Sequence, residues 1–130
     1  MVRPKILNMF KLGSERREFK GPKNTPSLKQ SVLRDGVAGE ANNDGSIVVD
    51  SNIPRDSKEF QRVLKHEMQH KKDMESGRAA YGENWVGWEG KVYFRRNING
   101  EDVIDGPAGR LPEGHPDHPW EQVAIAAEKE

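Results

Sequence analysis

The feature that most constrains the fold is one long amphipathic stretch between two breakers, over residues 57–76. Asp56 is a suitable N-cap with Glu59 three residues later, and Gly77 is a natural C-terminal stop. Apolar residues recur in the stretch at spacings of three and four: Phe60, Val63, Leu64, Met68 and Met74. This periodicity is typical of a helix that buries one face. The sequence therefore predicts a single long helix over residues 57–76.

Short strands, loops and a second helix are predicted around this helix. Residues 31–33 and 46–50 read as two short strands that could pair as a hairpin, with the stronger β signal at Ile47–Val49. Residues 91–96 and 101–104 flank an Asn-Gly turn, which also predicts a hairpin. Two segments, 78–90 and 105–118, are predicted to be loops. Residues 119–129, which open with a proline, are predicted to be the second helix. The expected fold class is α+β.

The composition separates a basic arm from a small domain. Residues 1–27 hold seven Lys or Arg against two Glu, although the whole chain has a formal net charge of zero. We expect residues 1–27 to be an N-terminal arm that could dock on a protein partner, and residues 28–130 to form one domain. Hydrophobic residues are only 33% of the chain, which is lean for a core, so a bound metal or a partner would help it fold.

Several classes of function are disfavoured by the composition. No stretch approaches the roughly 18 apolar residues of a membrane span. Outside the arm, nothing interleaves basic and aromatic residues as nucleic-acid surfaces do, so nucleic acid is an unexpected partner. The chain has no cysteine, which excludes disulfides and thiolate metal sites. We therefore expect a cytoplasmic protein, or a virion component assembled inside a cell, whose metal ligands are histidine and carboxylate.

The predicted helix contains the H-E-x-x-H sequence His66-Glu67-Met68-Gln69-His70. At about 100° per residue, His66 and His70 lie one turn apart and differ by only about 40° around the helix. Both imidazoles can therefore reach one zinc ion. Glu67 points to the side, where it could take a proton from a zinc-bound water as that water attacks a carbonyl. This chemistry explains why His, Glu and His are needed at these spacings.

A strand at Ile47–Val49 followed by a helix with H-E-x-x-H resembles the core of zincin metallopeptidases. The small gluzincin type, in which a second helix supplies a glutamate as third ligand, is the most similar form. The resemblance covers residues 45–130 and implies a small zincin-like domain with zinc as cofactor and a peptide or protein as substrate. The longer metzincin pattern is disfavoured, because it needs a Gly and then a His or Asp where this chain has Asp73 and Ser76.

Several residues are candidates for the third ligand. Glu121, near the start of the last predicted helix, is the first choice, since it resembles the glutamate of gluzincins. Asp73 is the rival, because it shares a helix face with the two histidines, although it is ~10 Å along the axis from His66 and its side chain is short. It is better suited to orient His70 by a hydrogen bond, or it could simply face solvent. His115 or His118 could also ligate the metal in place of Glu121.

Other polar residues could stabilise the oxyanion that forms at the attacked carbonyl. His115, His118, Tyr81 and Tyr93 have suitable donors, although a surface or packing role is an alternative for each. The three tryptophans are expected in the core or in the wall of a cleft. Ile47–Val49 is expected to be the edge strand that binds an extended peptide.

Two functions follow as expectations. The first is a zinc-dependent metallopeptidase that hydrolyses peptide bonds through Glu67. The second is a non-catalytic zinc domain that serves as a structural or assembly component. Small phage-encoded proteins look similar to this chain, which implies a possible virion role.

Overall fold

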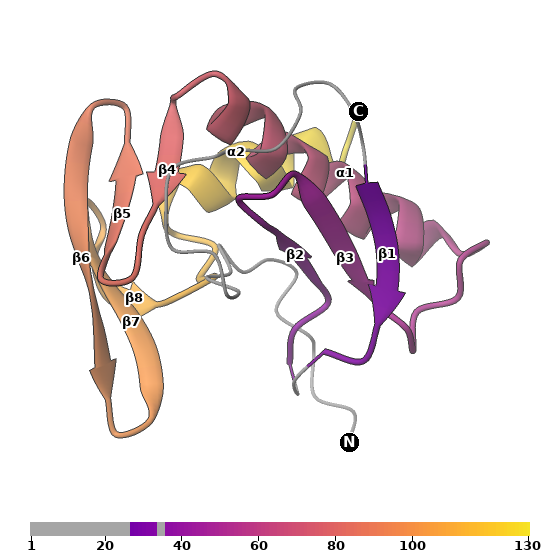
Figure 1. Ribbon diagram of the computed structural model, residues 1–130, viewed down its shortest axis with the longest axis horizontal. Coiled ribbons are helices and arrows are strands. Elements are labelled where there is room, and N and C mark those ends of the chain that lie inside the picture. The colour runs from indigo at the N-terminus through magenta and orange to yellow at the C-terminus, as the bar shows by residue number, and fades with distance from the viewer. Residues whose placement is uncertain (1–26, 34–35) are drawn as a thin grey trace.

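The computed structural model describes residues 27–33 and 36–130 and has an α+β architecture, as the sequence predicts. Two helices and two separate β-sheets make up this part of the chain (Figure 1). The predicted arm lies outside the described residues, except that Ser27 begins the first strand. In chain order the elements are β1 (Ser27–Ser31), β2 (Gly39–Ala41), β3 (Ser46–Asp50), α1 (Lys58–Glu75), β4 (Ala79–Tyr81), β5 (Trp85–Trp88), β6 (Lys91–Ile98), β7 (Glu101–Gly106), β8 (Gly109–Pro112) and α2 (Pro119–Ala127).

The first sheet has the strand order β1-β3-β2, so β3 is its central strand. β1 runs parallel to β3 with Ser27 opposite Ser46, and β2 runs antiparallel to β3 with Gly39 opposite Val49. The predicted hairpin of residues 31–33 with 46–50 is therefore wrong, and so is the assignment of Ile47–Val49 to the edge. The physical reason is burial: the apolar run of β3 is covered by a neighbour on each side, and Ile47 and Val49 lie in the core. The edge strands of this sheet are β1 and β2, and β2 lies against α1.

The second sheet is an antiparallel meander in the order β4-β5-β6-β7-β8. The predicted hairpin around the Asn-Gly turn is confirmed, since β6 pairs with β7 and both Asn99 and Gly100 have positive φ angles of 53° and 84°. The two predicted loops are wrong in part, because residues 78–90 contain β4 and β5 and residues 105–118 contain β8. These strands have only three or four residues each, so they are too short to show a clear alternation of polar and apolar residues.

α1 begins one residue later than predicted. Ser57, not Asp56, is the N-cap, and its hydroxyl accepts a hydrogen bond of 3.0 Å from the Phe60 backbone N–H. The predicted stop is confirmed, because Gly77 follows the helix with a φ of 81°. α2 begins at Pro119 as expected, with proline at the first helical position.

α1 contacts both sheets, and it shares in both hydrophobic clusters of the described residues. Its Phe60 and Val63 pack with Ile47 and Val49 of the first sheet. Its Met74 packs near the other end with residues of the second sheet and of α2, namely Tyr81, Val86, Trp88, Ile104 and Trp120. Figure 1 shows α1 and α2 side by side, with the second sheet to their left. This arrangement brings the N-terminal part of α2 against the middle of α1.

The start of α2 is fixed by buried polar contacts to the second sheet. Arg95 of β6 lies 2.7 Å from Glu113, just before α2, and also donates a hydrogen bond of 2.7 Å to the Gly82 carbonyl. Both side chains are buried, so this pair is well shielded from water. The pair connects the segment that leads into α2 to strand β6 of the meander.

In the part of the chain that the structure describes, neither helix is long and apolar enough to cross a membrane.

Candidate metal centre

His66 and His70 project from the same side of α1, toward α2. Their ring centroids lie 5.1 Å apart at an interplanar angle of 72°. The relative exposure of His66 is 1% and that of His70 is 0%, so both rings are buried. The helical spacing of the H-E-x-x-H sequence therefore places two imidazoles in one small volume, as the sequence predicts.

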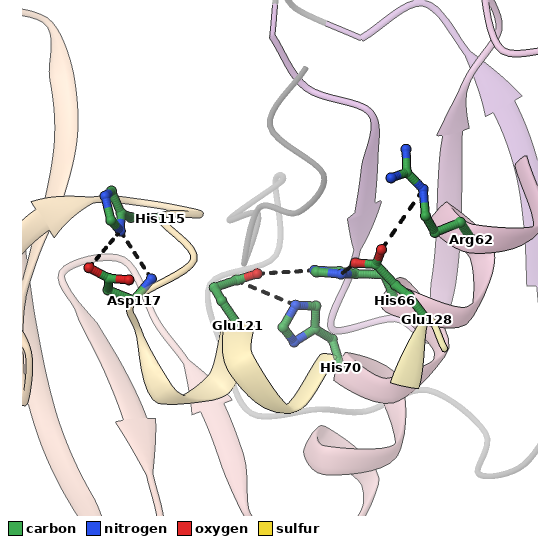
Figure 2. Close-up of polar contacts among 7 residues, drawn as sticks. All are labelled: Arg62, His66, His70, His115, Asp117, Glu121 and Glu128. Carbon is green, nitrogen blue, oxygen red and sulfur yellow. Dashed lines mark hydrogen bonds and ion pairs between the residues drawn. The ribbon is translucent and has the colours of Figure 1, made fainter. Parts of the chain in front are cut away.

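Glu121 of α2 completes this cluster (Figure 2). Its Oε1 atom lies 3.0 Å from His66 Nε2, and its Oε2 atom lies 3.4 Å from His70 Nε2. Pro119 starts α2 so that Glu121 stands in the first turn, facing α1. Ala124 and Ala127 are also buried on α2, and their small side chains permit the close approach of the two helices.

The three side chains fit a metal ion. One ligand atom from each lies within 4.8 Å of the other two, and no other group of three or more His, Asp or Glu in the described residues meets this condition. Ligands about 2.0–2.1 Å from a tetrahedral zinc ion are about 3.4 Å from one another. The two histidine-to-glutamate distances are close to this spacing. Glu121 Oε2 is buried without a hydrogen bond among the described residues, as expected for an atom that could bind a metal ion.

Glu67 lies beside this cluster but is not part of it. Its side chain has 0% exposure, and neither carboxylate oxygen has a hydrogen-bond partner among the described residues. Burial, and then the nearby charge of Glu121, raises the pKa of Glu67 well above its usual value. A buried and unpartnered carboxyl group costs stability, so its presence points to a role other than holding the fold.

The edge strand β2 covers Glu67. A Cβ atom added at Gly39 would lie 2.8 Å from Val63 Cγ1 and 3.1 Å from Glu67 Oε2. The backbone of β2 therefore touches the Glu67 side chain directly. Only glycine allows so close an approach between the strand and the helix.

The protonation states of the cluster follow from its burial. Burial lowers the pKa of His70 to about 3, and it also lowers the pKa of His66 against the opposing effect of its hydrogen bond with the Glu121 carboxylate. Burial raises the pKa of Glu121 to about 7. The histidines are therefore neutral near neutral pH, with a lone pair available for a metal.

One contact of the cluster was missed by sequence reasoning. Glu128, which follows the last residue of α2, places its Oε2 atom 2.5 Å from His66 Nδ1. Its Oε1 atom lies 3.9 Å from Arg62 Nε (Figure 2). A signal for it was present, because Glu128 is seven residues after Glu121 and so lies within about 20° of it around a helix.

Asp73 is buried, so the expectation that it simply faces solvent is wrong. Its carboxylate accepts a hydrogen bond of 3.1 Å from Gln69 and lies 3.8 Å from Arg78 Nη1. Its charge also acts on His70, whose pKa it raises slightly against the larger effect of burial. Asp73 therefore influences one of the two histidines without joining the cluster.

The remaining candidate histidines lie elsewhere. His118 is fully buried at the N-cap of α2, where its ring stacks on Trp120 at 4.6 Å and its Nε2–H donates to the Pro112 carbonyl at 3.1 Å. His115 is partly exposed, and its Nδ1 accepts a hydrogen bond from the Asp117 backbone. The structure does not bring either ring into the cluster with His66 and His70.

The aromatic candidates are used in packing. Tyr93 packs near Trp120 with ring centroids 6.1 Å apart. Tyr81 is fully buried, and its hydroxyl accepts a hydrogen bond of 3.1 Å from the Asn43 backbone. Trp88 and Trp120 belong to the core, as expected, while Trp85 is partly exposed and lies over Gly82. These contacts favour the packing alternative for both tyrosines.

No family model matches the chain, and no curated protein or solved structure matches it.

Proposed function

We propose that this protein is a zinc-dependent peptidase of the zincin type, with His66, His70 and Glu121 as zinc ligands. The observation that carries the proposal is Glu67, a fully buried carboxyl group with no hydrogen-bond partner among the described residues, beside a cluster that fits a metal. A glutamate that served only the fold would be paired, because an unpaired buried carboxyl group is costly.

The residues have distinct roles in this proposal. Zinc at this site would act as a Lewis acid that polarises a carbonyl and makes water more acidic. Glu67 takes a proton from the attacking water and returns one to the leaving amine. Burial, and then the charge of Glu121, raises the pKa of Glu67 well above its usual value, so the carboxyl group holds a proton more firmly than an exposed glutamate does.

The proposed substrate is a peptide or protein in an extended conformation. β2 is the edge of its sheet and touches Glu67 through Gly39. A peptide strand added along β2 would therefore place a carbonyl near Glu67. β2 therefore takes the place of Ile47–Val49 as the proposed strand that binds the peptide.

Glu67→Gln tests the function. The zinc-loaded protein and the variant would be incubated with a library of unfolded peptides, and cleavage would be followed by mass spectrometry. We expect the variant to keep its fold and one equivalent of zinc but to lose at least about 100-fold in rate, the lower range for general-base catalysis. Glu59→Gln, an exposed position on the same helix, is the matched control. Absence of cleavage by the zinc-loaded wild type, or equal rates in the variant, would refute the proposal.

A second candidate is a structural zinc domain within an assembly. It is favoured by the burial of all three ligand side chains to 1% exposure or less, since structural zinc sites are closed and catalytic ones keep an open position. If the zinc domain is structural, Glu67→Gln would leave its function intact, whereas His66→Ala would damage folding or docking. Docking through residues 1–27, a cytoplasmic or virion location and a phage origin remain predictions. Cross-linking and fractionation of the cells that make the protein would test the partner and the location.

A further inference from the structure

Two glutamates of α2 bracket the His66 ring. Glu121 lies 3.0 Å from Nε2 and Glu128 lies 2.5 Å from Nδ1, so each ring nitrogen faces a carboxylate (Figure 2). Both glutamates are largely shielded from water, with side-chain exposures of 1% and 7%. A neutral imidazole carries only one N–H, and therefore the position of its proton decides which nitrogen can bind a metal.

Helix stability does not explain why Glu128 is there. It lies at the C-cap of α2, where the helix dipole disfavours a negative charge. Its carboxylate is also largely buried, which adds a desolvation cost. Two contacts offset these costs only in part, since burial still raises the pKa of Glu128. Arg62 lies 3.9 Å from its Oε1 atom and favours the charged form, and His66 Nδ1 lies 2.5 Å from its Oε2 atom. The carboxyl group is thus directed at His66 Nδ1.

We propose that Glu128 is a positioning residue that keeps the His66 proton on Nδ1 and so directs the lone pair of Nε2 toward the metal centre. In this arrangement Arg62 orients Glu128, Glu128 accepts the Nδ1–H, and Nε2 presents its lone pair on the side of Glu121. Carboxylates that hold metal-binding histidines in this way fix both the tautomer and the ring orientation. The inference rests on the proposed metal site but not on peptidase activity.

The test compares Glu128→Gln and Glu128→Leu with Glu130→Gln, an exposed glutamate two residues further along the chain. Long-range ¹H–¹⁵N NMR of the metal-free protein reports which ring nitrogen of His66 carries the proton. We expect the Nδ1–H form in the wild type and in Glu130→Gln. The amide oxygen of Glu128→Gln can still accept a hydrogen bond and should preserve part of this preference, whereas Glu128→Leu should lose it.

Zinc affinity, measured by competition with a chelator, is the second readout. We expect Glu128→Leu to bind zinc about 10–100-fold more weakly, Glu128→Gln to be intermediate, and Glu130→Gln to be unchanged. Circular dichroism checks that each variant is folded, and Glu128→Gln, which has nearly the same shape as the native residue, serves if the leucine variant unfolds. A wild-type His66 protonated at Nε2 would overturn the proposal, and so would folded variants with unchanged tautomer and affinity.

The outcomes separate this inference from the proposed function. A protein that binds zinc and shows the expected tautomer, but cleaves no peptide, would refute the peptidase and leave the role of Glu128 standing. A protein that cleaves peptides with unchanged zinc affinity in both Glu128 variants would refute only the positioning role.

Discussion

Glu121 Oε1 lies 3.0 Å from His66 Nε2, although 55 residues separate the two in the chain. This contact exists because α2 packs against α1 through small residues, and the meander between them returns the chain to the same face. The relationship makes Glu121 the candidate third ligand on geometric grounds, in addition to its place in the sequence.

Replacing Glu121 by glutamine should weaken zinc binding strongly. The change removes a charged ligand atom while keeping the shape of the side chain. The loss of affinity should exceed the roughly 10–100-fold that follows from loss of a supporting contact. Chelator competition measures it, with Glu130→Gln as the exposed control on the same segment. Retention of a full equivalent of zinc at wild-type affinity would show that Glu121 is not a ligand.

Zinc affinity should rise with pH up to about pH 7 and then level off. The pKa of Glu121 is raised to about 7 by burial, and this proton must leave when the carboxylate binds a metal. His70, with a pKa of about 3, is already neutral over this range and releases none. One proton released per zinc corresponds to about a tenfold change in affinity for each pH unit below 7. Calorimetry in buffers of different ionisation enthalpy measures the release, and equal affinities at pH 5.5 and pH 8 would contradict it.

Gly39→Ala should disturb the packing of β2 against the Glu67 side chain. The added Cβ would lie 2.8 Å from Val63 Cγ1 and 3.1 Å from Glu67 Oε2, so the strand or the Glu67 side chain must move. We expect a loss of about 1–3 kcal/mol in the free energy of unfolding and a lower rate of peptide cleavage. Zinc affinity should change little, because Gly39 does not touch the ligands. Thermal unfolding, chelator competition and rate measurements on the same sample separate these effects, and wild-type values throughout would exclude a close packing of β2 on Glu67.

His118→Ala should reduce stability without reducing zinc content. The buried ring stacks on Trp120 and donates to the Pro112 carbonyl, so its removal leaves a cavity and takes one hydrogen bond from that carbonyl, which keeps its bond from the His115 backbone N–H. The expected loss is on the order of 2–3 kcal/mol, whereas His115→Ala, at a partly exposed position, should stay within about 0.5 kcal/mol. Denaturant unfolding measures both variants. A His118 variant with normal stability and no turnover would instead support a catalytic role.

The local parts of the fold were predictable from the sequence. Periodicity and end signals located α1 to within one residue at its start, because helical contacts join residues three and four apart. The difference between Asp56 and Ser57 is small, since both residue types cap helices well. The Asn-Gly turn likewise marked the β6–β7 hairpin, because this dipeptide readily adopts the positive φ angles that a tight turn requires.

The pairing of distant strands was not predictable in the same way. β1 is parallel to β3 and precedes β2, so no short-range pattern reveals that β3 is central. β4 and β5 are short and lie among glycines, so the sequence predicts a loop there, although Tyr81 and Trp88 are buried core residues. Their identity as strands depends on pairing with each other and with β6, which is a tertiary effect.

Some residues of the candidate site were likewise predictable from the sequence, and others depend on tertiary contacts. His66, Glu67 and His70 follow from the periodicity of one helix, and Glu121 followed from a resemblance. The roles of Glu128 and Gly39 depend on how α2 and β2 dock on α1. The burial of Asp73 also depends on how the chain packs around α1. Such contacts join residues far apart in the chain, and a single sequence gives no measure of their proximity.

Anomalous diffraction at the zinc absorption edge, from crystals of the zinc-loaded protein, would show whether these three side chains bind zinc together. We expect one strong peak about 2.0–2.1 Å from His66 Nε2, His70 Nε2 and an oxygen of Glu121. A peak bound to only one of the two imidazoles, or bound at another place while these side chains keep the arrangement described above, would contradict this expectation.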